Sequence, residues 1–134
     1  MIFVDTSAWY ALEVEDDVNH EAACKFLSII ASGKYGISVT TDYILDETIT
    51  LLWSRRSPSS ASAFINKIMK SKSVRVFWVE DDLFEKALDM FKRSDGKSWS
   101  FTDCTSFALI KDLSIPNAFT FDNHFREAGL QILL

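Results

Sequence analysis

The sequence has 134 residues, of which 48% are hydrophobic and 25% charged, and its formal net charge is −5. This length predicts one domain, residues 1–134, with enough chain to bury a hydrophobic core. Two prolines and four glycines leave no room for a flexible linker or a low-complexity tail. No apolar run reaches the roughly twenty residues of a membrane span, and the start lacks a basic signal-peptide region. We therefore expect a cytoplasmic protein without a membrane segment.

Apolar runs and helical periodicities alternate along the chain. Short runs rich in apolar residues predict strands over residues 1–4, 37–40, 74–79, 117–121 and 130–133. Amphipathic spacing predicts helices over residues 7–13, 17–31, 41–55, 58–71, 81–93 and 102–113, with Val18 on the core face of the second. Because most of these strands are continuously apolar, we predict a mostly parallel five-stranded sheet covered on both faces, a three-layer α/β/α sandwich.

Charge is unevenly distributed along the chain. Residues 1–47 carry nine acids and two bases, and residues 80–134 carry ten acids and six bases. The stretch 48–79 has no acid, and its six bases are Arg55, Arg56, Lys67, Lys70, Lys72 and Arg75. Such a block is either a solvated face or a surface that binds phosphates beside an acidic pocket. A negative net charge alone therefore does not exclude a nucleic-acid partner.

Four acids occupy unusual places in the predicted fold. Asp5 ends the first strand and Asp122 directly follows the fourth, so both lie where sites form in parallel sheets, at the carboxyl ends of strands. Glu47 and Asp103 fall on the apolar faces of their helices. Acids seldom lie on such faces unless something compensates their charge. The four positions together predict one shared site.

Each acid also has a structural alternative. Asp5 can cap the helix that follows it, and Asp103 completes a capping box with Ser100. Asp122 can cap a following turn, and Glu47 can be a partly exposed helix residue. The acids are more informative as a set, because no lysine or arginine stands near three of the four in the sequence.

Four clustered carboxylates cannot all stay ionised unless a cation compensates them or their pKa values rise. A ligand set made only of oxygen suits Mg²⁺ or Mn²⁺ and not zinc. Such a cluster can hold a phosphate oxygen and lower the pKa of a bound water. The sequence leaves open whether one ion or two would bind.

Four short segments carry a resemblance to a known family. In chain order they are Val4-Asp5-Thr6-Ser7, Asp46-Glu47, Phe101-Thr102-Asp103-Cys104 and Thr120-Phe121-Asp122-Asn123-His124-Phe125. Together they resemble the PIN-domain ribonucleases, and most closely the VapC-type toxins of prokaryotic toxin–antitoxin pairs. The resemblance covers essentially the whole chain.

This resemblance implies a sheet with strand order 3-2-1-4-5 and an endoribonuclease that uses Mg²⁺ or Mn²⁺ to cut RNA phosphodiester bonds. The acidic ligands carried over by position are Asp5, Glu47, Asp103 and Asp122, oriented by the polar side chains of Ser7 and Thr102. The resemblance also implies a homodimer held inactive by a VapB-like antitoxin. His124 is expected to support the site structurally, because a four-acid metal site needs no histidine base.

Two other functions are compatible with parts of the pattern. A phosphohydrolase of the haloacid-dehalogenase type also begins with an acid after the first strand. That chemistry requires a second aspartate two positions after Asp5, where this chain has Ser7. A catalytically degenerate PIN fold would instead bind RNA or protein, although the presence of all four acids argues against it.

Overall fold

The computed structural model describes residues 1–132, and its centre is one sheet of five parallel strands in the order β3-β2-β1-β4-β5. The strands are β1 (Ile2–Val4), β2 (Ser38–Thr41), β3 (Val74–Phe77), β4 (Asn117–Phe119) and β5 (Gln131–Ile132). Strand number, direction and order agree with the prediction. Several strands are shorter than predicted, and residue 133 of the predicted fifth strand lies outside the described residues.

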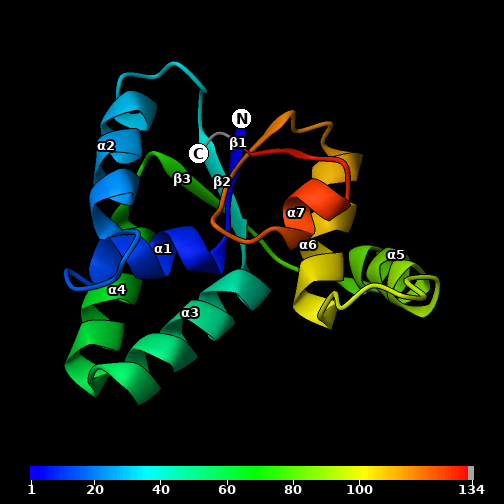
Figure 1. Cartoon of the computed structure of the whole chain (residues 1–134), viewed down its shortest axis with the longest axis horizontal. Coiled ribbons are helices and arrows are strands. Elements are labelled where there is room, and N and C mark those ends of the chain that lie inside the picture. The colour runs from blue at the N-terminus through cyan, green and yellow to red at the C-terminus, as the bar shows by residue number, and fades with distance from the viewer. Residues whose placement is uncertain (133–134) are drawn as a thin grey trace.

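Seven helices lie within the described residues. They are α1 (Thr6–Glu13), α2 (His20–Ala31), α3 (Asp42–Arg55), α4 (Pro58–Lys70), α5 (Asp81–Lys92), α6 (Phe101–Asp112) and α7 (His124–Glu127). Helices α1, α2 and α4 lie on one side of the sheet and α5, α6 and α7 on the other, which gives the predicted three layers (Figure 1). Between residues 1 and 132, no helix is both long enough and apolar enough to cross a membrane.

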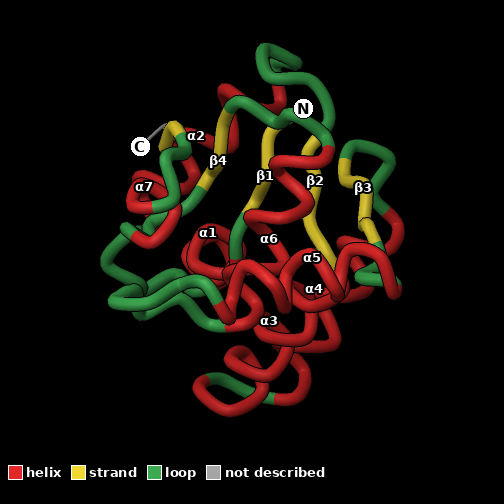
Figure 2. Tube along the Cα trace, turned by 90° about the vertical axis from the view of Figure 1, so that its right-hand side faces the viewer, coloured by secondary structure: helices red, strands yellow, loops and turns green. Residues whose placement is uncertain are grey.

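Helix α3 lies beyond the carboxyl ends of the strands (Figure 2). It contacts α1 and α4 from one layer and α6 from the other. The hydroxyl of Thr41 caps its start by accepting the Ile44 N–H at 3.0 Å. Because α3 spans both layers at this end of the sheet, its side chains can meet those that leave β1 and β4.

The start of α2 differs from the prediction. The pattern placed residues 17–31 in one helix with Val18 facing the core, but the helix begins at His20 and Val18 is 92% exposed. The side chain of Asp17 accepts the backbone N–H of Asn19 at 2.8 Å, which favours a turn over a helix. The turn leaves Asp17 and Asn19 beside the carboxyl end of the sheet, where they line a pocket.

Aromatic packing fixes the chain after β4. Phe125 of α7 is fully buried, and its ring centroid lies 6.0 Å from that of Phe3 and 5.0 Å from that of Phe107. Phe119 at the end of β4 packs against Phe26 at 4.8 Å. Removing a fully buried aromatic ring costs about 3–5 kcal/mol, so this cluster holds the segment 120–124 firmly against the sheet.

Candidate functional site

Asp5 leaves the end of β1 with one carboxylate oxygen held by three donors. Its Oδ2 accepts the Ser7 hydroxyl at 2.8 Å, the Ser7 N–H at 3.3 Å and the Thr120 hydroxyl at 2.9 Å. Only 4% of the residue is exposed, and this burial raises the pKa of Asp5 to about 6 although the donors lower it. None of these three hydrogen bonds involves Oδ1, so that oxygen is available to bind a ligand.

Backbone N–H groups fix the direction of the two hydroxyls. Ser7 Oγ accepts the N–H of Phe121 at 2.9 Å, and Thr120 Oγ1 accepts the N–H of Asp122 at 3.0 Å. Because each hydroxyl accepts one of these N–H groups, its own proton is available to Asp5. The parallel pairing of β1 with β4 brings these groups together, and the Asp5 N–H extends that ladder to the Phe119 carbonyl at 3.1 Å.

Glu47 lies partly buried on α3, on the side that faces Asp5. Burial raises the pKa of Glu47, while the nearby Thr6 side chain lowers it. The charges of Asp103 and Asp122 raise that pKa further. Since electrostatic repulsion of this kind needs short separations, Glu47 shares its surroundings with both aspartates.

Asp103 and Asp122 meet at His124. Asp103 Oδ2 accepts the Ser100 N–H and faces His124 Nδ1, both at 3.0 Å. Asp122 Oδ1 accepts the His124 backbone N–H at 2.9 Å and lies 3.4 Å from Nδ1. The Ser98 hydroxyl lies 3.3 Å from the other ring nitrogen, Nε2. Burial raises the pKa of Asp103, and the charge of Asp122 raises it further.

The four predicted acids therefore gather at one end of the sheet. Asp5, Glu47 and Asp122 line one pocket of about 300 Å³. Asp103 joins them through Asp122, since the ligand atoms of Asp103, Asp122 and His124 lie within 4.8 Å of one another, close enough to hold a metal ion. Asp5 and Asp103 also cap α1 and α6. The capping interpretation is therefore confirmed for Asp5 and Asp103, while the action of the four acids as one metal site stays a prediction.

A model of the PIN domain matches residues 2–130 of the chain. The chain belongs to the PIN domain family, among the VapC-type ribonucleases. The match covers β1 to β4 and ends just before β5, and it includes all four acids.

Similar proteins support the assignment of this chain to the PIN domain family. The chain is 40% identical over 129 residues to the 23S rRNA-specific endonuclease VapC20 of Mycobacterium tuberculosis, covering 96% of this chain and 95% of that one. It is 29% identical over 123 residues to a VapC ribonuclease of Archaeoglobus fulgidus, covering 91% and 77% of the two chains. The crystal structure of M. tuberculosis VapC20, described as a sarcin–ricin loop cleaving toxin, superposes with a TM-score of 0.88 at 37% identity, covering 97% and 96%.

The groups that orient the acids of this PIN domain differ in part from those expected. Ser7 bonds to Asp5 directly. Within residues 1–132 the Thr102 hydroxyl makes no hydrogen bond to an acid, and the Thr102 carbonyl instead accepts the Thr105 hydroxyl at 2.7 Å. Thr120, which sequence reasoning missed, bonds to Asp5. Its position two residues before Asp122, at the end of a strand, was the available signal.

The predicted basic residues are dispersed over the PIN domain. Arg55 lines the acidic pocket. Arg56 pairs with Asp16 at 3.2 Å, and Lys67 pairs with Glu13 at 2.7 Å. The remaining three, Lys70, Lys72 and Arg75, lie at the end of α4, in the following loop and on the edge strand β3.

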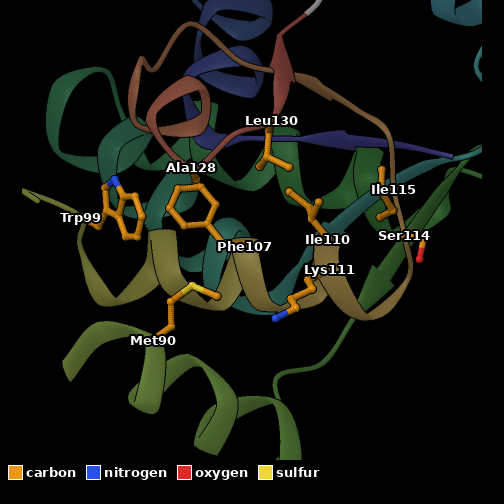
Figure 3. Close-up of a pocket in the computed structure, with 9 residues that line it drawn as sticks. All are labelled: Met90, Trp99, Phe107, Ile110, Lys111, Ser114, Ile115, Ala128 and Leu130. Atoms are coloured by element: carbon orange, nitrogen blue, oxygen red, sulfur yellow. The ribbon is translucent and has the colours of Figure 1, made fainter. Parts of the chain in front are cut away.

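A larger pocket of the PIN domain lies apart from the acids. It has a volume of about 610 Å³ and lies between α5, α6 and the segment after α7 (Figure 3). Most of its lining side chains are apolar, among them Met90, Trp99 and Phe107, and Lys111 is the charged one. None of the four acids lines it. This pocket is therefore separate from the acidic site.

Proposed function

We propose that this protein is an endoribonuclease that hydrolyses RNA phosphodiester bonds at a divalent-metal site formed by Asp5, Glu47, Asp103 and Asp122. The observation that carries the proposal is the convergence of these four carboxylates from separate elements on one end of the sheet. Burial raises the pKa values of Asp5, Glu47 and Asp103, and neighbouring acids raise those of Glu47 and Asp103 further, which is the electrostatic situation that a bound cation relieves.

The residues fit Mg²⁺ or Mn²⁺, because the acids offer oxygen ligands. In both Asp5 and Asp103, the orienting donors bond to Oδ2, and these hydrogen bonds leave Oδ1 available. A divalent ion held by these carboxylates would supply charge stabilisation for a phosphoryl group and a water of lowered pKa. Ser7 and Thr120 hold the Asp5 carboxylate in place, and His124 holds that of Asp103.

The relatives suggest the substrate and partner. One relative, at 40% identity, is a 23S rRNA-specific endonuclease, and its structure is that of a sarcin–ricin loop cleaving toxin. The first substrate to test is therefore the sarcin–ricin loop of 23S ribosomal RNA. A VapB-like antitoxin, a homodimeric assembly and a cytoplasmic location complete the proposal, since VapC proteins are the toxins of toxin–antitoxin pairs.

The test uses purified protein and an RNA hairpin that reproduces the sarcin–ricin loop. We expect cleavage with Mg²⁺ or Mn²⁺, none with EDTA, and none by Asp5→Asn, which keeps the size and capping capacity of the side chain. Asp95→Asn, in an exposed loop, serves as the matched control and should cut normally. Undiminished cutting by Asp5→Asn would overturn the mechanism.

A thermal-shift titration with Mn²⁺ addresses the non-catalytic alternative. A bound ion should raise the melting temperature of the wild type but not that of Asp5→Asn. RNA binding with neither cleavage nor a metal-dependent shift would instead favour a degenerate PIN fold that only binds RNA or protein.

A further inference from the structure

Among the residues that the structure describes, 1–132, Arg55 is the one basic residue that lines the acidic pocket. Four carboxylates share this pocket with it, those of Asp5, Asp17, Glu47 and Asp122. Within residues 1–132, Arg55 nevertheless forms no ion pair with any of them. Its positive charge is therefore available to another anion that enters the pocket.

The helical repeat explains why Arg55 faces the acids. Glu47, Leu51 and Arg55 follow one another at intervals of four residues on α3, so they form a single stripe, and all three line the pocket. Side chains on a helix lean toward its N-terminus, which directs the Arg55 side chain back along this stripe toward Glu47.

Tyr10 holds the guanidinium in this position. Tyr10 lies on α1, one turn after Thr6 and Ser7, and it also lines the pocket. The guanidinium carbon of Arg55 lies 5.6 Å from the centroid of the Tyr10 ring. An aromatic face attracts a cation without neutralising it, whereas a carboxylate partner would cancel the charge. Tyr10 therefore orients Arg55 while leaving its charge without a carboxylate partner.

We propose that Arg55 binds an RNA phosphate beside the bond that is cut, and that Tyr10 is the positioning residue for its guanidinium. This inference rests on the proposed nuclease function. An RNA backbone that approaches several carboxylates is repelled by them, and a cation on the same wall of the pocket offsets that repulsion. The planar guanidinium can also bond two phosphate oxygens at once, which fixes the register of the strand.

RNA affinity tests the Arg55 contact. We would measure fluorescence anisotropy of a labelled sarcin–ricin hairpin with Asp5→Asn protein, which does not cut, over a range of salt concentrations. Arg55→Gln should weaken binding about tenfold and lower the slope of log affinity against log salt by about 1. Arg55→Lys should keep the slope and lose part of the affinity, because it keeps the charge but not the planar group.

Arg93→Gln is the matched control, since it also removes one arginine charge, from a residue that pairs with Asp89 on α5. It should leave affinity and salt slope close to those of the parent protein. Equal behaviour of Arg55→Gln and Arg93→Gln would overturn the contact.

Steady-state cleavage tests the role of Tyr10 in protein that retains Asp5. Tyr10→Leu should raise KM several-fold with little change in kcat, and Tyr10→Phe should restore the wild-type KM because it keeps the aromatic face. Melting temperatures identify any variant that fails to fold. A kcat loss for Tyr10→Leu that Tyr10→Phe does not repair would overturn the positioning role.

The outcomes separate this proposal from the nuclease function. Cleavage that is normal in Arg55→Gln would exclude the contact and leave the nuclease intact. Binding that depends on Arg55, by a wild-type protein that never cuts RNA, would support the contact and exclude the nuclease.

Discussion

The two halves of the acidic site are built in different ways. Asp5 is almost fully buried and is held by hydroxyl groups from α1 and from the segment after β4, so it depends on strand pairing across the sheet. Asp103 is held within its own helix by the capping box with Ser100, and from outside by the imidazole of His124. The first half is thus a product of tertiary structure, and the second combines a local motif with one tertiary contact.

This difference indicates where each half is vulnerable. Hydroxyl donors are small and neutral, so a change there disturbs the direction of Asp5 without altering the charge of the site. The imidazole lies between two carboxylates, and its removal affects Asp103 and Asp122 together. Loss of a hydroxyl should therefore disturb the Asp5 carboxylate alone, whereas loss of the imidazole should disturb two carboxylates.

The largest effect is expected from direct loss of a ligand. Asp103→Asn should lower cleavage about a thousandfold, which corresponds to about 4 kcal/mol of transition-state stabilisation. Asp122→Asn should lower cleavage less than Asp103→Asn does, by about thirtyfold. The reason is that Asp122 is more exposed than Asp5 and can act on the ion through a water. Single-turnover cleavage rates measure both. Equal losses would show that Asp122 is as close a ligand as Asp103.

The sequence predicted the acids better than the groups that orient them. Asp5 and Asp122 follow apolar strands, and Glu47 and Asp103 interrupt apolar helix faces, so local patterns were sufficient to find all four. Thr120 had a weaker signal, its position at the end of a strand two residues before Asp122. Its hydroxyl lies 3.1 Å from that of Ser7, 113 residues away in the sequence, and only the pairing of β1 with β4 brings them together.

The fold, like the site, was predicted only in part from local sequence patterns. Strand order followed from the family resemblance, and the helix positions followed from periodicity. The start of α2 was missed because Val18 fits a helical apolar stripe, while the competing Asp17 side-chain turn was decisive. Arg55 is an intermediate case, since it was predicted only as one of six bases, although its spacing of eight residues from Glu47 is that of a shared helix stripe.

A second prediction compares two hydroxyls that the resemblance treated alike. Ser7→Ala should lower Mn²⁺ affinity about thirtyfold, because changes in the groups that orient metal ligands typically cost tenfold to a hundredfold. Thr102→Ala should remain near the wild-type value, since its hydroxyl bonds to none of the acids within residues 1–132. Isothermal titration with Mn²⁺ measures both variants. A larger loss for Thr102→Ala would reverse this assignment.

A third prediction concerns stability without metal. The folded-state pKa of Asp5 is about 6 against an unfolded value of 3.8, so the folded protein binds the proton more tightly. The stabilising contribution of the protonated Asp5 carboxyl is present below pH 3.8 and is lost as pH rises through 6. At pH 7 in EDTA, Asp5→Asn should therefore raise the free energy of unfolding by roughly 3 kcal/mol. Urea denaturation measures this gain, which should vanish near pH 4 if its origin is the charge.

The smallest effect is expected from pH acting on metal binding. Carboxylates must lose their protons to bind an ion, and the raised pKa of Asp5, about 6, makes protons compete within an accessible range. Mn²⁺ affinity should be nearly constant above pH 7 and fall about tenfold per pH unit below 6 for each proton displaced. Titrations between pH 5 and 8 measure this, with Asp5→Asn as the comparison. The variant should bind more weakly throughout but with a shallower slope, because the Asp5 proton no longer competes. An unchanged slope would assign the competing proton to the Asp103 half of the site, where burial also raises the carboxyl pKa.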